Sequence, residues 1–394
     1  MKIAMVSENA DPSRAVGLGA PGSQHVHVDA LATGLIRLGH TVTVVTSEAA
    51  AAAPGSAPQR DYAVVRLRGS SFGETNAGAA GDASPEFAAQ LGQLLSRGGY
   101  DVVHAHFWRS AWATRRAARA VGLPWAVTFH ELGSIERRRL GVDDPNPACR
   151  VAVEATLADD ADLVIAVCAD HVRELAALGV DGPHICVVPG GVDLQRFTPR
   201  PPPVGPAHVL AFGLDGEQEG LADLVIAIAQ LPGVFLTVVG GPERAELGRS
   251  VEARRLGRLA EGLGCAERIR LTGHATLAAL PELLESADVV AITPRSVPVP
   301  AGAVEAMACA RPLVATGVGA LTDLVDVGVT GDIVPPGRPD ALAAALDALL
   351  RDTERARRYG AQGAAVARAG LGWEATCRRT AAALATLCPS GAGV

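Results

Sequence analysis

Five histidines lie where strands are expected to end or a helix to begin. His25 and His27 precede a helical pattern, His104 and His106 lie in DVVHAHFW, and His130 lies in AVTFHELG. Imidazole is a common metal ligand and also a hydrogen-bonding partner for hydroxyl groups. The sequence after His130 lacks the second histidine of H-E-x-x-H, and no cysteine or carboxylate completes a tetrahedral ligand spacing. We therefore favour histidines that bind a hydroxyl-rich ligand over a metal site, and a purely structural role remains open for His104.

A glycine-rich segment, GLGAPG at residues 17–22, matches the pattern G-x-G-x-x-G. In a dinucleotide-binding loop the first glycine follows the strand at once, whereas here about ten residues intervene. Glu48, after the second expected strand, could replace the acid that binds ribose, so an NAD(P)-dependent enzyme stays an alternative. A flexible loop that leads into a helix N-terminus and favours an anion explains the segment better. A plain turn is the remaining interpretation.

Short apolar runs must position these residues, and they alternate with helical patterns along the first half of the chain. Continuous β-branched strands separated by helices indicate a parallel sheet covered on both faces. Helices are expected near Val26–Leu38 and Phe87–Arg97. The expected strands are Lys2–Val6, Thr41–Thr46, Val64–Leu67, Asp101–His104, Trp125–Thr128, Leu163–Val167 and Ile185–Val188.

A proline-rich segment, TPRPPPVGPA, then interrupts the pattern, and we interpret residues 199–207 as a linker. The alternation then restarts. The further expected strands are His208–Phe212, Phe235–Val239, Ile269–Leu271, Val289–Thr293, Pro312–Ala315 and Asp332–Val334. The further expected helices are Gly220–Gln230, a long helix Ala245–Leu263, Leu277–Ser286 and a helical region Pro339–Leu387. The sequence predicts an α/β protein of two Rossmann-like domains, residues 1–198 and 208–372, with parallel sheets facing across a cleft. Ligands of such domains bind at the carboxyl ends of the strands.

Composition excludes several classes of function. Of the 394 residues, 48% are hydrophobic and 20% charged, which is a globular balance, and the net charge of −7 argues against electrostatic binding of nucleic acid. Lys2 is the only lysine, so neither a Schiff-base lysine nor a P-loop lysine is available.

The first ten residues resemble a strand rather than a signal peptide, and no apolar run reaches the roughly 18 residues of a membrane span. The seven cysteines are scattered and include no C-x-x-C pair, which favours reduced thiols. We expect a cytoplasmic protein without a transmembrane segment.

Several segments, in order along nearly the whole chain, resemble the family 4 glycosyltransferases of the GT-B fold. They are GSQHVHV, VVHAHFW, VTFHELG, VVPGGVDLQRF, VVGGPE, VEAMACARPLVAT and GALTDLVDVGVTGDIVPP. The resemblance implies that a sugar is transferred from a nucleotide-diphosphate donor to an acceptor hydroxyl with retention of anomeric configuration. It also implies an N-terminal acceptor domain and a C-terminal donor domain, with a last helix at about residues 373–388 that packs back onto the first domain.

The same resemblance assigns roles to single residues. His130 is expected to contact the transferred sugar as the catalytic residue, and His25 and His106 to lie on the acceptor side. Gly22, Ser23, Gly213, His274, Arg295 and Glu305 are expected to bind the donor, with Glu305 on the ribose hydroxyls and the Gly273-His274 segment at the base. No cofactor and no metal are expected, because in this fold positive side chains and a helix N-terminus stabilise the charge of the diphosphate in place of a metal.

The chain departs from the family pattern at the donor phosphates. Where the family has Gly-Arg and, five residues later, Lys-Gly, this chain reads GLDGEQEG, which puts Leu214 and Glu219 at the cationic positions. The first of the two family glutamates is Val297, and a family glycine is Pro300, which has no N–H to donate.

These departures leave two functions open. Each charge-assisted contact with a phosphate contributes about 1.5–3 kcal/mol, so their loss weakens donor binding by about three orders of magnitude unless another group compensates. Arg295 is the nearest candidate for compensation, ahead of Arg244 and Arg338. The chain is either a transferase with a rearranged donor site or a pseudo-glycosyltransferase, a folded scaffold that binds a ligand or partner protein without catalysis.

Overall fold

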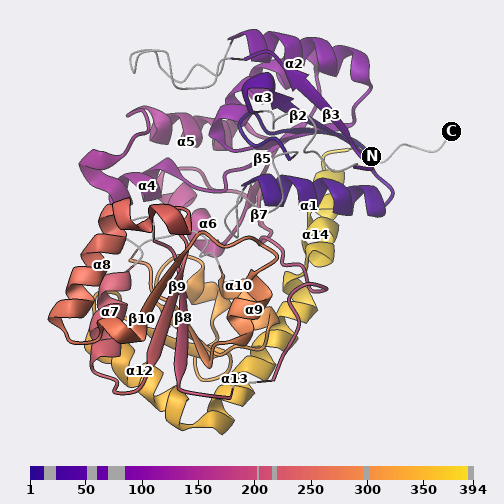
Figure 1. Cartoon of the computed structure of the whole chain (residues 1–394). Coiled ribbons are helices and arrows are strands. Elements are labelled where there is room, and N and C mark those ends of the chain that lie inside the picture. The colour runs from indigo at the N-terminus through magenta and orange to yellow at the C-terminus, as the bar shows by residue number, and fades with distance from the viewer. Residues whose placement is uncertain are drawn as a thin grey trace. The chain divides into compact units, whose positions relative to one another are not determined.

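The structure, a computed structural model, describes residues 1–12, 24–50, 60–69, 85–201, 204–214, 220–295 and 302–388. The described residues form two compact units. Unit 1 comprises residues up to 190 together with 373–388, and unit 2 comprises residues 191–372. Each unit contains one sheet, and Figure 1 labels some of the strands of each.

The sheet of unit 1 has seven strands in the order β3-β2-β1-β4-β5-β6-β7, and all of the pairings are parallel. β1 lies between β2 and β4, so the chain reverses the direction in which strands are added after β3. The strands are β1 (Lys2–Val6), β2 (Thr41–Ser47), β3 (Ala63–Leu67), β4 (Val102–His106), β5 (Trp125–Thr128), β6 (Leu163–Ala166) and β7 (Ile185–Val187).

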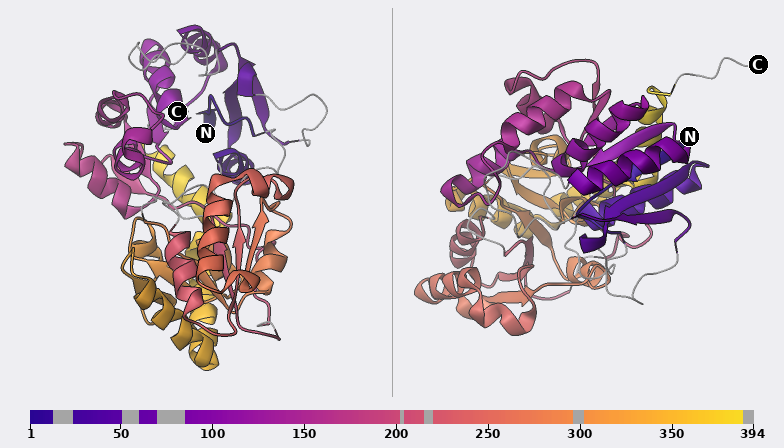
Figure 2. Two further views of the ribbon diagram at one scale, coloured as in Figure 1. Left: turned by 60° about the vertical axis from the view of Figure 1, so that its left-hand side comes forward. Right: turned by 90° about the horizontal axis from the view of Figure 1, so that it is seen from above.

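Helices cover both faces of this sheet, as the two views of Figure 2 show. Alternate residues of β1 point to opposite faces, so Ile3 and Met5 join one core cluster while Ala4 and Val6 join the other. The helices are α1 (Gln24–Arg37), α2 (Pro85–Gly98), α3 (Trp108–Val121), α4 (Gly133–Leu140), α5 (Arg150–Asp160), α6 (Ala169–Ala177) and α14 (Trp373–Ala385).

Helix α14 packs against α1, although more than three hundred residues separate them in the chain (Figure 1). The approach is close because α1 has a glycine there: a Cβ atom on Gly34 would lie 2.2 Å from the Cys377 Sγ atom. The Thr376 hydroxyl donates a hydrogen bond to the Pro189 carbonyl at 3.0 Å. The end of the chain therefore completes the core of unit 1.

The sheet of unit 2 has six strands in the order β10-β9-β8-β11-β12-β13, the doubly wound order around β8. Its strands are β8 (His208–Phe212), β9 (Phe235–Val239), β10 (Ile269–Gly273), β11 (Val289–Ile292), β12 (Leu313–Thr316) and β13 (Gly331–Val334). Its helices are α7 (Leu221–Ala229), α8 (Val251–Gly262), α9 (Leu280–Glu285), α10 (Ala303–Ala308), α11 (Leu321–Leu324), α12 (Pro339–Arg351) and α13 (Thr353–Val366).

The predicted fold class, α/β with two parallel-sheet domains, is confirmed. One helix differs: in place of a long helix Ala245–Leu263, a 3₁₀ helix Arg244–Arg249 precedes α8. Ser250 causes the break, because its backbone is extended and its hydroxyl accepts a hydrogen bond from the Ala253 N–H at 3.2 Å.

Residues 191–198, which the sequence pattern places in the first domain, pack with unit 2. The Val192 N–H donates to the Leu371 carbonyl at 2.8 Å, and Phe197 is buried in a core cluster with β8 and β11 residues. The described part of unit 2 therefore begins before the proline-rich segment. None of the helices in the described ranges has the length and apolar character that a membrane crossing requires.

Candidate functional site

Three histidine rings from three elements meet at the carboxyl edge of the unit 1 sheet. His106 ends β4, His130 follows β5 by two positions, and His27 lies in the first turn of α1. The His106 Nδ1 atom is 3.1 Å from the His130 Nε2 atom. The centroid of the His27 ring is 4.7 Å from that of His130 and 5.7 Å from that of His106. Trp373, at the start of α14, lies edge-on to His27 at 5.3 Å.

The register of β4 and β5 explains why the cluster forms. His106 is opposite Thr128 in these parallel neighbours, so their carboxyl ends and the residues that follow lie side by side. His104, two residues earlier in β4, is buried, and its Nε2 atom is 2.9 Å from the Thr128 hydroxyl. That contact gives His104 the structural role that the sequence left open.

Burial keeps the imidazoles neutral. It lowers the pKa of His27 to about 4 and that of His104 to about 3. The pKa values of His106 and His130 also lie well below the ordinary value, because burial is reinforced by repulsion from neighbouring rings. A neutral imidazole offers one N–H donor and one acceptor nitrogen, the combination that a sugar hydroxyl can satisfy.

A buried ion pair anchors the loop that carries His130. The Arg150 Nε atom donates to the Glu154 carboxylate at 2.6 Å, and the Arg150 Nη2 atom donates to the Glu131 carbonyl at 3.3 Å. The second Glu154 oxygen accepts from the Gly133 N–H at 2.6 Å. The backbone at Glu131 and Gly133, directly after His130, is therefore fixed by hydrogen bonds to both members of the ion pair.

Phe107, the residue after His106, has a strained backbone. Its φ of 73° is in the left-handed region, which a bulky side chain rarely adopts. The Phe107 N–H donates to the Thr128 carbonyl at 2.8 Å, and the Arg150 guanidinium lies over its ring at 5.0 Å. The turn from β4 into α3 is thus fixed directly beside the histidines.

Glu8 is a candidate that the sequence reasoning missed. It follows β1 by two positions and is 1% exposed, and its backbone N–H donates a hydrogen bond to the Ser110 hydroxyl at 2.9 Å. Burial raises the pKa of Glu8 to about 7, although the Arg109 charge opposes the rise. A lone acid after a strand carries no motif, so only the fold reveals its burial.

At the corresponding edge of unit 2, the residue after β8 and its glycine is apolar. Gly213 has a φ of 92°, and its N–H donates to the Val239 carbonyl at 2.9 Å. Leu214 is 2% exposed and belongs to the unit 2 core. A Cβ atom on Gly241 would lie 2.9 Å from the Leu214 Cβ atom. At the position where the family pattern has an arginine, this chain therefore has a packed core side chain.

Two glycines of the neighbouring loops are required by close approach. Gly220 has a φ of 65°, and a Cβ atom there would lie 1.9 Å from the Thr293 carbonyl oxygen. Gly302 has a φ of 83°, and a Cβ atom there would lie 2.3 Å from the Phe212 ring. A side chain at either position would clash with its neighbours, so both positions require glycine.

Arg295, the expected compensating cation, has an acidic partner within unit 2. Its Nη2 atom lies 3.0 Å and 3.1 Å from the two oxygens of Asp223, and its Nε atom lies 3.3 Å from one of them. Arg338 likewise pairs with Asp340 at 2.8 Å. Both guanidinium charges are already balanced by a carboxylate.

Glu305 and His274, the other expected donor contacts, lie in different elements, and His274 directly follows β10. Glu305 is in α10; burial raises its pKa, while hydrogen bonds from the Gly302 and Glu305 amides oppose the rise. The His274 N–H donates to the Pro242 carbonyl at 2.9 Å, and its Nδ1 atom is 3.7 Å from the Glu243 carboxylate. The Glu305 residue as a whole is partly exposed, although burial of its carboxyl group raises the pKa.

The comparisons with known proteins agree with this architecture. The family model described as Glycosyltransferase Family 4 matches residues 24–196, and the one described as Glycosyl transferases group 1 matches residues 207–352. A D-inositol 3-phosphate glycosyltransferase from Mycobacterium marinum is 32% identical over 95% of this chain and 82% of its own length. One from Xylanimonas cellulosilytica is 31% identical over 95% and 94%.

The chain belongs to the family 4 glycosyltransferases. A sucrose-phosphate synthase from Thermosynechococcus elongatus has a similar structure, with a TM-score of 0.85 and 25% identity over 98% of each chain. Anabaena HepE, solved in complex with UDP and glucose, has a TM-score of 0.74 and 21% identity over 98% of this chain and 100% of its own. The resemblance seen in the sequence and the GT-B fold are thereby confirmed.

Several of the expected positions of this glycosyltransferase lie outside the described residues. They are Gly22, Ser23, Glu219, Val297 and Pro300. His25 is described: its Nδ1 atom is 3.1 Å from the Asp11 carbonyl oxygen, while His27, two residues on, provides the ring that contacts His106 and His130. The roles assigned to these residues stay predictions.

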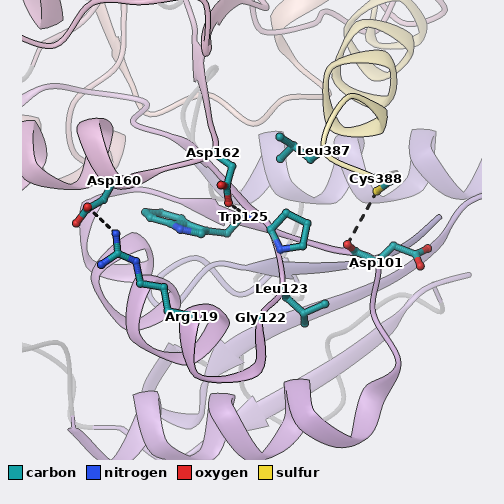
Figure 3. A pocket seen from close by; sticks show the side chains of 10 residues that line it. Asp101, Arg119, Gly122, Leu123, Trp125, Asp160, Asp162, Leu387 and Cys388 are labelled. Atoms are coloured by element: carbon teal, nitrogen blue, oxygen red, sulfur yellow. Dashed lines mark hydrogen bonds and ion pairs between the residues drawn. The ribbon is translucent and has the colours of Figure 1, made fainter. Parts of the chain in front are cut away.

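A pocket elsewhere in this glycosyltransferase lies at the opposite edge of the unit 1 sheet. It is lined by residues that precede β4, β5 and β6, including Asp101, Pro124 and Asp162, and by Cys388 (Figure 3). Arg119 donates to Asp160 at 2.6 Å on one side of it. Because catalytic groups of this topology gather at the carboxyl ends of strands, we do not assign the pocket to the transfer reaction.

Proposed function

We propose that this protein transfers a sugar from a nucleotide-diphosphate sugar to an acceptor hydroxyl with retention of anomeric configuration. The observation that carries the proposal is the contact between His106 and His130, two neutral imidazoles at the carboxyl ends of adjacent strands. His130 would hydrogen-bond the transferred sugar, and the strained turn at Phe107 with the Arg150–Glu154 pair would hold its neighbourhood in place.

In the proposed reaction the bond between the anomeric carbon and the diphosphate oxygen breaks through an oxocarbenium-like state. The acceptor hydroxyl then attacks from the same face, and its proton passes to the departing diphosphate. No protein nucleophile is required. The task of the protein is to hold the two substrates and to stabilise the charge that develops on the diphosphate.

Within unit 2, we propose that Glu305 accepts hydrogen bonds from the ribose hydroxyls and that the segment at His274 lines the base pocket. The diphosphate would meet fewer cations than the family pattern provides, since Leu214 is in the core and Arg295 pairs with Asp223. Arg244, exposed at the start of the 3₁₀ helix after β9, is the compensating cation that we favour. No metal is required for this step.

The test is a transfer assay on the purified full-length chain with UDP-, GDP- and ADP-sugars. Inositol phosphates and sugar phosphates are the first acceptors to try. The reason is that the chain is similar in sequence to D-inositol 3-phosphate glycosyltransferases and in structure to a sucrose-phosphate synthase. The proposal expects one donor to be consumed and one glycoside to form, whose anomeric configuration nuclear magnetic resonance assigns. An inverted product would contradict retention, and the absence of any product would contradict catalysis under these conditions.

A second candidate is a pseudo-glycosyltransferase, a scaffold that binds a ligand or partner without transfer. It is favoured by the substitution of a buried leucine for a cation at residue 214 and by the pairing of Arg295 with Asp223. Calorimetric titration with the same donors separates the candidates. Binding at micromolar strength supports the transferase, whereas a folded protein that binds no donor at millimolar concentration supports the scaffold.

A further inference from the structure

We propose that His27, His106 and His130 form a binding site for a zinc-class divalent cation within unit 1. The three side chains come from α1, the end of β4 and the loop after β5. One ring nitrogen of each lies within 4.8 Å of the ligand nitrogens of the other two. The inference goes beyond the proposed transfer reaction and does not rest on it.

One of the three nitrogen–nitrogen distances is close to that of a tetrahedral site. Zinc binds imidazole nitrogen at about 2.0–2.1 Å, so two nitrogens on one tetrahedral zinc are about 3.3–3.4 Å apart. The His106 Nδ1 and His130 Nε2 atoms are already 3.1 Å apart. His27 is partly exposed at the first turn of a helix, so rotation of its side chain can bring the third nitrogen nearer.

The hydrogen bonding of the histidines in this region is incomplete among the described residues. Among the described residues, the His106 Nε2 and His104 Nδ1 atoms are buried and have no hydrogen-bond partner. Buried polar atoms in native proteins are nearly always paired with protein, water or an ion. The contact between His106 Nδ1 and His130 Nε2 uses the nitrogens that would bind the cation. The unpaired His106 Nε2 atom is on the other side of that ring, so it marks an incompletely bonded cluster and is not itself a proposed metal ligand.

The donor set selects the kind of metal. Three imidazole nitrogens without a carboxylate suit zinc, cobalt, nickel or copper, whereas magnesium and calcium prefer oxygen ligands. Three protein ligands leave a fourth position for water or a hydroxyl group of a ligand. Trp373 packs against the outer side of the His27 ring and limits how far that ring can turn away.

An occupied site would oppose the transfer reaction. The metal would engage the His130 ring, which is proposed to bind the sugar, so zinc would inhibit transfer while leaving the fold intact. Magnesium would not reproduce this inhibition, because it does not bind the cluster.

The experiment uses the metal-free full-length chain titrated with Zn²⁺ by calorimetry and with Co²⁺ by visible absorption. We expect one Zn²⁺ per chain and the absorption spectrum of tetrahedral Co²⁺ without a sulfur charge-transfer band, which distinguishes the cluster from the seven cysteines. His27→Gln, at a partly exposed position, should weaken Zn²⁺ binding by about a hundredfold or more. The matched control is His184→Gln, outside the cluster, which should bind as the parent does.

A second variant guards against misfolding. His130→Gln should also lose the cobalt spectrum, and circular dichroism establishes that each variant is folded. The proposal is overturned if the parent chain shows no tetrahedral cobalt spectrum, or if folded His27→Gln and His130→Gln bind Zn²⁺ as tightly as the parent. Because these readouts are of binding, they do not depend on whether the chain catalyses transfer.

Discussion

The two sheets share a strand order around their first strand, yet the residues that follow that strand differ in kind. In unit 1, β1 is followed by the buried acid Glu8, and β4 and β5 end in interacting histidines. In unit 2, β8 is followed by Leu214, which fills the core, and the nearby Arg295 is engaged by Asp223. The comparison shows that one topology can keep its strand ends polar in one unit and pack them in the other. Gly220 and Gly302 of unit 2 still make close backbone contacts, although unit 2 lacks the cation of the family pattern at residue 214.

The largest expected effect is that of His130→Ala on the transfer rate, because this substitution removes a polar group from the strand ends of unit 1. If the chain catalyses transfer, the rate should fall by about 100-fold or more, because a hydrogen bond made to the transferred sugar is lost. Initial rates with the donor that is turned over measure the effect. His184→Ala is the control and should retain the parent rate; equal rates for both variants would remove His130 from the reaction.

The next effect concerns the apolar strand end of unit 2. Leu214→Ala should lower the free energy of unfolding by about 3 kcal/mol, because it leaves a cavity in a packed core. Urea denaturation measures the loss. Leu263→Ala, at a residue 42% exposed, serves as the matched control and should cost far less. Similar losses would mean that Leu214 is not a core residue, and the contrast between the units would fail.

The buried acid of unit 1 predicts a pH dependence of stability. Because burial raises the pKa of Glu8 from 4.5 to about 7, the folded state binds its proton more tightly than the unfolded state. This group therefore lowers stability as pH rises from about 4.5 to 7. Glu8→Gln should remove that loss and gain on the order of 2 kcal/mol over the parent at pH 8 but little at pH 4.5.

Urea denaturation of both proteins across this pH range checks the prediction. The surface variant Glu261→Gln is the control and should show the same pH dependence as the parent. If the stability difference between Glu8→Gln and the parent does not grow with pH, the Glu8 carboxyl group is not held neutral by the fold.

The smallest effect concerns the ion pair of unit 2. Asp223→Asn should release Arg295 and strengthen donor binding by about two- to fivefold at low salt, since a partly exposed ion pair contributes less than about 1 kcal/mol. Calorimetric titration with the donor measures the change. Asp347→Asn, which releases Arg351 in α12, is the control and should leave the donor affinity unchanged. A weaker affinity for Asp223→Asn would mean that Asp223 positions Arg295 for the phosphates rather than withholding it.

The strands were the most predictable part of the fold. Lys2–Val6, Trp125–Thr128, His208–Phe212 and Phe235–Val239 are found with the bounds that the sequence predicts, because each is a short apolar run between clear breaks. The break at Ser250 was missed, since a single capping serine within a helical pattern gives a weak local signal.

The site was less predictable, because its contacts join distant parts of the chain. His106 and His130 could be singled out by their positions after strands, but the contact of His27 with both depends on how α1 packs. The pairing of Arg295 with Asp223 spans 72 positions and follows no sequence pattern. The proximity of three histidine rings was not predicted either, because side chains from three separate elements have no characteristic spacing in the sequence.

The return of α14 to unit 1 has a consequence for how the protein is made. The residues of α1 that α14 covers are synthesised early, whereas Trp373 follows only after all of unit 2 has been translated. At about 5–20 residues per second, the ribosome needs roughly ten to forty seconds to extend the chain from unit 1 to this helix. Throughout that interval the nascent first unit lacks the contact that Cys377 makes at Gly34 of α1, and this surface of α1 stays uncovered by α14. The histidine cluster, too, gains its contact with Trp373 only when translation has passed that point.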